Sequence, residues 1–153
     1  MLTTFLRAGL VTAVTDGLFS SVLAAFFYGS TVKRLWQGVA SVLLGATALD
    51  GGTRTAIVGV LMHVGVAFSW TAVFLVVFLS SSWIRGVLES LPGTLAAAAV
   101  YGPLVWIAMS LAIVPLFTHR QPIINMRWWI QFAGHVVFVA LPIVAIVRST
   151  RLQ

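Results

Sequence analysis

The chain has 153 residues, of which 60% are hydrophobic and only 8% are charged. A soluble domain is about 45–50% apolar and about 25% charged, so these values exclude a soluble globular protein and equally a disordered or fibrous one. Nine basic residues against three acidic ones give a net charge of +6, but the basic residues are scattered between apolar runs. We therefore expect a single-domain, all-α integral membrane protein (residues 1–153) whose counter-charge is anionic lipid headgroups and not nucleic acid.

Four apolar runs are long enough to cross a bilayer, whose hydrocarbon core takes roughly 20 helical residues. In chain order, the predicted spans cover residues 5–28, 55–79, 92–117 and 128–147. Pro103 and Pro142 lie inside the third and fourth spans, where each removes a backbone hydrogen bond and should kink its helix. We expect these spans to form a four-helix transmembrane bundle.

The even number of spans places both termini on one side of the membrane. The basic residues divide almost evenly between the two sides: Arg7, Arg85, Arg148 and Arg151 on the side of the termini, and Lys33, Arg34, Arg54, Arg120 and Arg127 on the other. The positive-inside rule does not decide the orientation on such a balance, and we favour cytoplasmic termini.

Residues 32–48, between the first two spans, are predicted to form a short amphipathic helix that lies in the membrane interface. Apolar side chains recur there at helical spacing from Leu35 to Ala46. The polar side chains lie mostly on the opposite face: Lys33, Arg34, Gln37 and Ser41. Trp36 and Ser41 are expected at the membrane surface. The alternative is that the first or second span extends beyond its predicted end.

Apart from Arg7 near the start of the first span, three acidic or histidine side chains fall inside the spans, where each is costly unless it is paired, neutralised or hydrated. They are Asp16 in the first span, His63 in the second and His135 in the fourth. The second and fourth helices run in the same direction, and each histidine lies about two turns, roughly 12 Å, beyond its helix start. Asp16 lies one turn deeper. We expect one intramembrane polar cluster, with Gln131 on the face of His135 as its hydrogen-bonding partner.

Small residues lie on the helix faces that carry these polar groups. We expect helix packing at four of them: Gly9, Ala13, Gly59 and Ala67. The first pair shares the face of Asp16 and the second pair shares the face of His63. Small side chains allow neighbouring helices to approach closely, so the polar groups should lie at contacts between helices.

The predicted polar cluster is open to three interpretations. It can be structural, with Asp16 accepting a histidine N–H across helices. His63 and His135 can instead bind a haem or chlorophyll-type tetrapyrrole for electron transfer, with Gly59 leaving room for the flat ring. Asp16 can also carry protons or ions in proton-coupled transport. Gln131 is bulky where the edge of a ring would pass, so we expect no tetrapyrrole and no stoichiometric metal in the purified chain.

No catalytic constellation is found in the sequence, so we do not expect an enzyme. The loop carboxylates have no second carboxylate nearby, and there is no cysteine to act as nucleophile or metal ligand. The expected function is a non-enzymatic accessory or packing subunit of a larger membrane assembly. Its small-residue faces, at Gly9 and Ala13 and at Ala96 and Ala99, would contact other membrane subunits or a second copy.

Short motifs are distributed along most of the chain: AVTD at 13–16, LWQGVAS at 35–41, LGATA at 44–48, GVLMH at 59–63, VPL at 114–116 and LPI at 141–143. Together they resemble a family of small bacterial inner-membrane proteins with four spans and no characterised function. That resemblance implies a bundle that encloses one aspartate and two histidines. It also implies localisation in the bacterial inner membrane.

Overall fold

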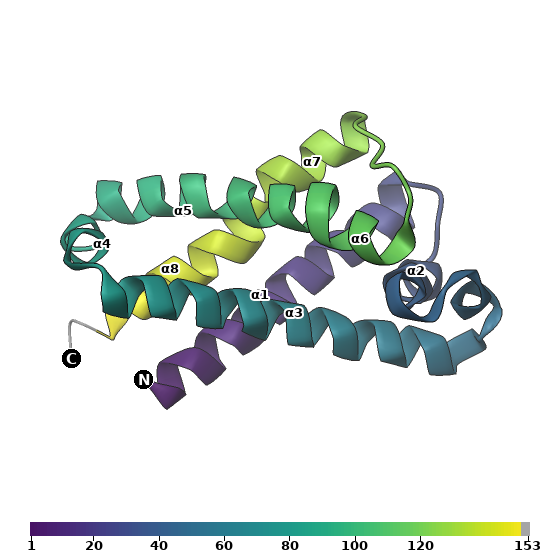
Figure 1. The fold of residues 1–153 in the computed structure, drawn as a ribbon, viewed down its shortest axis with the longest axis horizontal. Coiled ribbons are helices and arrows are strands. Elements are labelled where there is room, and N and C mark those ends of the chain that lie inside the picture. Colours follow the sequence, from purple (N-terminus) through teal and green to yellow (C-terminus); the bar gives the residue numbers. More distant parts are fainter. Residues whose placement is uncertain (151–153) are drawn as a thin grey trace.

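The computed structural model describes residues 1–150, within which every regular element is a helix (Figure 1). As predicted, four of the described helices are long and apolar enough to cross a membrane: Leu2–Phe27, Gly52–Ser80, Leu91–Thr118 and Met126–Ser149. Each begins and ends within a few residues of its expected bounds. Arg151, expected on the side of the termini, lies outside the described residues.

Three of the four spans change helix type along their length. The first joins α1 (Leu2–Val22) to the π-helical η1 (Leu23–Phe27), whereas the second is the single helix α3 (Gly52–Ser80). The third consists of α5 (Leu91–Ile107), the π-helical η3 (Ala108–Ile113) and α6 (Val114–Thr118). The fourth consists of α7 (Met126–His135), the π-helical η4 (Val136–Ala140) and α8 (Leu141–Ser149).

Short helices connect the first three spans. The first two spans are connected by α2 (Val32–Leu44) and the 3₁₀-helical η2 (Ala46–Asp50), and the second and third by α4 (Ser82–Val87).

Polar caps determine where several helices begin. The side chains of four N-cap residues accept the backbone N–H three residues later at 3.0–3.2 Å: Thr31, Ser81, Ser90 and Asn125. These bonds satisfy N–H groups that have no partner within the helix.

Two of the π-helical segments come directly before prolines. η3 ends just before Pro115, and η4 ends just before Pro142. A proline lacks the N–H that an upstream carbonyl needs, and a wider turn redistributes the remaining hydrogen bonds. By contrast, α5 continues as a regular α-helix through Pro103, where we had expected a kink.

Both ends of the described chain lie at the same end of the bundle, as an even number of spans requires (Figure 1). The hydroxyl groups of Thr4 and Thr150 meet there at 2.9 Å. The connection through α4 also lies at this end, which we call the terminal end. α2 and the loop before α7 lie at the opposite end, which we call the α2 end.

Large apolar residues and polar residues are buried in different parts of the bundle. The main apolar cluster joins α3, α5 and α8, and includes Phe74, Phe78, Val105, Ile143, Val144 and Val147. Buried positions of α1, α2 and the first half of α3 are small or polar instead, and include Ala13, Asp16, Gly17, Gln37, Ala40 and Gly59. The polar interior therefore lies toward the α2 end.

α2 packs across the first half of α3, and its faces differ from those predicted. Gln37, expected on the polar outer face, is buried and donates an Nε2 hydrogen to the carbonyl of Gly52 at 3.1 Å. Trp36, expected at the membrane surface, is half-buried, with its ring directed toward His63 and Gly17. Lys33 and Arg34 are exposed as expected, and so are the apolar side chains of Val32, Leu43 and Leu44.

The close approach at Gly59 explains this rotation of α2. A Cβ atom on Gly59 would overlap the carbonyl oxygen of Trp36 and would lie 3.2 Å from the backbone nitrogen of Ala40. The backbones of α2 and α3 are therefore in direct contact, as small residues permit. This contact turns the side of α2 between Trp36 and Ala40 toward α3, whatever the polarity of its side chains.

Candidate functional site

Asp16 and His63 face each other where α1 meets α3. His63 Nδ1 lies 3.8 Å from Asp16 Oδ2, and His63 Nε2 lies 3.0 Å from the carbonyl oxygen of Ala13. A carbonyl oxygen only accepts, so Nε2 carries the hydrogen and donates it. Nδ1 is then the atom that faces the carboxyl group. A proton on either Nδ1 or Oδ2 turns the repulsion between their lone pairs into attraction.

Two buried oxygen atoms beside this pair have no hydrogen-bond partner within residues 1–150. They are Asp16 Oδ1 and the hydroxyl oxygen of Thr12, one helical turn apart on α1. Asp16 is only 9% exposed and Thr12 only 1%. An unsatisfied buried polar group costs about 1–3 kcal/mol. The site therefore has unused capacity for a water molecule, a proton or a small cation.

His135 lies at the end of α7 and is buried on a different contact. Its Nδ1–H donates to the backbone carbonyl of Gln131 at 2.8 Å, so the expected partner acts through its backbone and not through its side-chain amide. The Trp106 ring packs against the imidazole with centroids 4.8 Å apart. In the described chain, no hydrogen bond or ion pair joins His135 to Asp16 or His63.

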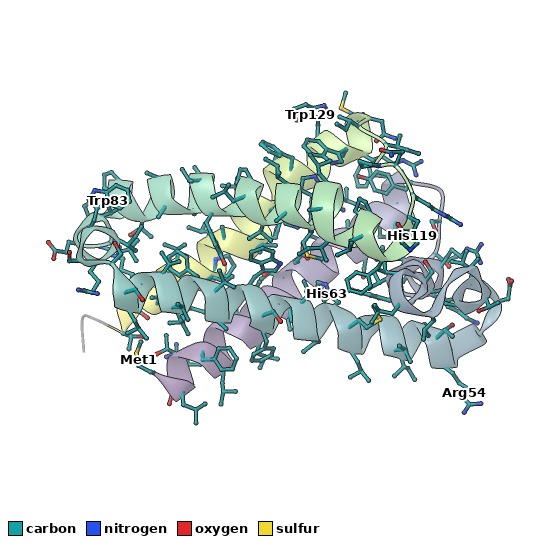
Figure 2. All side chains as sticks on the ribbon, viewed as in Figure 1. Met1, Arg54, His63, Trp83, His119 and Trp129 are labelled. Atoms are coloured by element: carbon teal, nitrogen blue, oxygen red, sulfur yellow. The ribbon has the colours of Figure 1, made fainter. Side chains whose placement is uncertain are left out.

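Gly102 allows α5 to approach the backbone of His135. A Cβ atom on Gly102 would lie 2.6 Å from the carbonyl carbon and oxygen of His135. The third and fourth spans are therefore in backbone contact at this histidine, which holds its ring against Trp106 on the neighbouring helix. His119 is separate from both histidines, because it lies at the α2 end (Figure 2).

Sequence reasoning missed two residues that enclose His63. The Trp36 ring lies against the imidazole with centroids 5.2 Å apart, and Gly17 lies beneath both rings. A Cβ atom on Gly17 would lie 3.4 Å from His63 Nε2 and 3.5 Å from the Trp36 ring. Trp36 thus covers the Asp16–His63 pair from the side of α2. The glycine next to Asp16 was the available signal.

A third polar side chain on α1 connects the site to the fourth span. The Thr15 hydroxyl is within hydrogen-bonding distance of the Phe138 carbonyl, at 2.7 Å, and also of carbonyls of its own helix. Phe138 lies inside η4, where the wide turn changes the pairing of backbone carbonyls. Thr15 and Asp16 therefore bring α1 into polar contact with two neighbouring spans.

All four expected packing residues are buried: Gly9, Ala13, Gly59 and Ala67. Gly9 lies directly against the Phe68 ring, and Ala13 supplies the carbonyl that His63 contacts. The α2 backbone fills the space beside Gly59, so this glycine does not provide the slot that we had suggested for a flat ring. Gly9 and Ala13 are likewise engaged inside the chain and do not face a further subunit.

The arrangement suits proton or water chemistry better than ligation of a metal. Both ring nitrogens of His63 already have a neighbour, one a carbonyl and the other a carboxyl group. Among residues 1–150, no three histidine, aspartate or glutamate side chains are grouped so that they could hold a metal ion.

Comparisons with protein-family models, with curated proteins and with solved structures find no match to this chain. The candidate site therefore has to be interpreted from its own chemistry.

Proposed function

We propose that this chain is a multi-pass protein of the bacterial inner membrane, with four spans, cytoplasmic termini and α2 in the interface. The length and hydropathy of four helices support the spans. α2 lies across the bundle beside the end of the third span, as an interfacial helix would (Figure 1). The inner membrane is supported by the motif resemblance alone. A C-terminal reporter that is active only in the cytoplasm tests the orientation.

Its proposed role is that of a non-enzymatic accessory or packing subunit. The exposed residues on the outer face of α5 support this proposal. Ala96 and Ala99 are exposed on this face, and the large residues beside them, Leu95 and Val100, are 50% and 62% exposed. Small residues between large ones form a shallow groove that accepts the side-chain ridge of another helix. Within the described chain these α5 residues are exposed, whereas Gly9 and Ala13 are already buried.

Native mass measurement after gentle detergent extraction tests this role. The chain should be recovered in a particle larger than the monomer, and Ala99→Ile should reduce the share of that particle. Ala145→Ile is the matched control, because Ala145 is an exposed alanine on α8, away from the groove. A monomer for the wild-type chain, or equal effects of the two substitutions, would contradict the subunit role.

Proton-coupled transport through Asp16 is a second candidate function, favoured by the buried oxygens that lack a partner. Asp16 Oδ1 and the Thr12 hydroxyl have no hydrogen-bond partner in the described chain, and the carboxyl group faces His63 Nδ1, with which it can exchange a proton. Infrared spectra recorded across a pH series test it. A carboxylic-acid band that changes with pH, is lost in Asp16→Asn and persists in Asp50→Asn supports a proton relay. A spectrum that Asp16→Asn leaves unchanged contradicts it.

Electron transfer through a tetrapyrrole would require His63 to give up its present contacts, and we propose that the purified chain carries no tetrapyrrole and no stoichiometric metal. The engaged ring nitrogens of His63 and the filled space beside Gly59 support this proposal. An absorbance spectrum of the extracted protein tests it. A Soret band near one equivalent, lost in both His63→Ala and His135→Ala, would favour electron transfer instead.

A further inference from the structure

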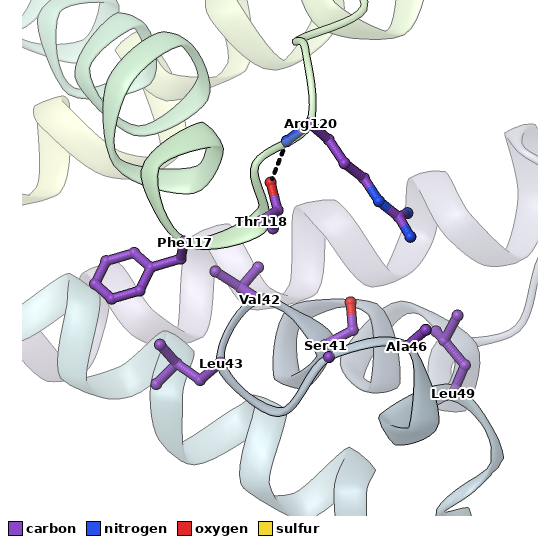
Figure 3. Close-up of a pocket in the computed structure, with 9 residues that line it drawn as sticks. Ser41, Val42, Leu43, Ala46, Leu49, Phe117, Thr118 and Arg120 are labelled. Carbon is purple, nitrogen blue, oxygen red and sulfur yellow. Dashed lines mark hydrogen bonds between the residues drawn. The ribbon is translucent and has the colours of Figure 1, made fainter.

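A cavity of about 320 Å³ opens between the C-terminal half of α2 and the end of the third span (Figure 3). Its volume lies at the lower end of the range of about 300–1,000 Å³ for ligand pockets. Its large apolar lining residues are Val42 and Leu43 from α2, Leu49 from η2 and Phe117 from α6, and Ser41 and Thr118 add polar surface. Arg120 belongs to the lining and comes from the loop after α6 (Figure 3). The cavity thus combines polar and apolar walls with one cationic side chain.

The end of α6 positions Arg120. His119 follows α6 in the left-handed conformation, with φ at 52°, which ends the helix and changes the direction of the chain. The backbone N–H of Arg120 then donates to the Thr118 hydroxyl at 3.4 Å. Within residues 1–150, the Arg120 guanidinium has no hydrogen bond, ion pair or ring contact. It is therefore a cation without a protein partner in the lining of the cavity.

The other polar groups of the lining cannot replace it as donors. The Ser41 hydroxyl donates to the Gly38 carbonyl at 2.7 Å, and the Thr118 hydroxyl donates to the Val114 carbonyl at 2.9 Å. Their hydrogens are engaged, so the guanidinium is the side-chain donor that a ligand in the cavity would meet. A guanidinium matches the two oxygens of a phosphate in a bidentate geometry.

The surroundings of the cavity are also positive. The α2 end carries five basic residues and one acidic residue, namely Lys33, Arg34, Arg54, Arg120 and Arg127 against Asp50. Arg34 lies next to the cavity, because its Nη1 donates to the carbonyl of Leu49 at 2.8 Å. An anionic group is attracted to such a region, and each basic side chain contributes about 1 kcal/mol at a membrane surface.

We infer that this cavity binds the headgroup of an acidic phospholipid, with Arg120 on its phosphate. The cavity is level with Phe117 and Thr118, the last residues of the third span, which is where lipid phosphates would lie. The acyl chains would then follow the outward-facing side chains at its edge, Leu43 at 57% and Phe117 at 53% exposure. The exposed apolar side chains at its edge contribute nothing to the binding of inorganic phosphate, so an amphiphile fits this site better than a free anion.

Native mass spectrometry of the full chain in detergent tests the inference, with phosphatidylglycerol and phosphatidylcholine of identical acyl chains as probes. The wild-type chain should retain phosphatidylglycerol preferentially. Arg120→Gln should lower this preference by about fivefold, the value of one basic side chain at a membrane surface. Arg54→Gln is the matched control, because it removes the same charge at the same end of the bundle away from the lining. It should retain most of the preference.

A second variant tests the cavity itself. Ala46→Trp should fill the space and displace the lipid while the helix content by circular dichroism stays unchanged, since Ala46 is an exposed lining residue. Equal losses in Arg120→Gln and Arg54→Gln would mean that diffuse surface charge attracts the lipid, and would overturn the inference. So would full retention in a folded Ala46→Trp variant. Competition by millimolar inorganic phosphate that removes the bound lipid would identify a free-anion site instead.

Discussion

Gly59→Ala adds one methyl group where α2 and α3 lie closest together. The new Cβ would overlap the Trp36 carbonyl oxygen and lie 3.2 Å from the backbone nitrogen of Ala40. Both are backbone atoms, so no side-chain rotation relieves the contact and α2 has to move away from α3. Gly65→Ala is the matched control, because Gly65 lies in the same helix and a Cβ there meets nothing within 4 Å.

The control isolates the energy of this contact. Replacing glycine by alanine inside a helix gains roughly 0.8–1 kcal/mol from helix propensity, and both variants share that gain. An extra methyl group in a packed interior costs about 1–3 kcal/mol, and rigid backbone neighbours favour the upper half of that range. We therefore expect the free energy of unfolding of Gly59→Ala to be about 2–3 kcal/mol below that of Gly65→Ala.

Unfolding of the purified chain in mixed detergent, followed by circular dichroism, measures this difference. A second readout is the labelling rate of a single cysteine at Ser41, which is specific because the chain contains no other cysteine. Displacement of α2 should change that rate in Gly59→Ala and leave it unchanged in Gly65→Ala. Equal stabilities and equal labelling rates would refute the backbone contact, and with it the explanation of why α2 turns Trp36 inward.

Tyr101→Phe removes the hydroxyl that donates to an α3 carbonyl at 2.6 Å, and should lower the free energy of unfolding by about 0.6–2 kcal/mol. Tyr28→Phe should not lower it and can raise it, because the described chain offers that buried hydroxyl no partner, and equal losses would contradict the assignment. Asp16→Leu removes the group that faces a histidine across α1 and α3, so it should lower the melting temperature or alter the NMR titration of a histidine. If both the melting temperature and the histidine titration stay unchanged, Asp16 makes no stabilising contact with a histidine in the interior. A cysteine at Ser41 should react with a water-soluble maleimide, whereas a cysteine at Ala40, which is 0% exposed, should not. If the cysteine at Ser41 reacts from neither side of the membrane, α2 does not lie at the membrane surface.

The helices could be predicted from composition because an apolar run of span length has few alternatives to a helix. The faces of α2 could not, because polarity alone does not say which side meets a neighbour. Trp36 and Gln37 face inward because a glycine on α3 admits the α2 backbone, a contact that depends on two segments at once. Leu43 and Leu44 are left outside for the same reason.

The candidate site was predictable in depth but not in rotation. A rise of 1.5 Å per residue is enough to put Asp16 within reach of His63, and small residues on both faces favour the contact. The same calculation does not predict how the fourth span is rotated about its own axis. In the structure, His135 donates a hydrogen bond to the backbone of its own helix and packs against Trp106. The π-helical turns also alter the angle between successive residues, and the sequence marks only two of the three, by a proline that follows.

The wide turn at η4 has a consequence for how this sequence can tolerate insertion and deletion. A π-helical turn accommodates one residue more than an α-helical turn while the helix on either side keeps its orientation. Loss of one residue from α7 or α8 would rotate everything beyond it by about 100°. Loss of one residue within η4 would instead restore a regular helix, with His135 and Ile143 still directed inward. What such a deletion would remove is the Phe138 carbonyl as a partner for Thr15, and so the polar link between the first and fourth spans.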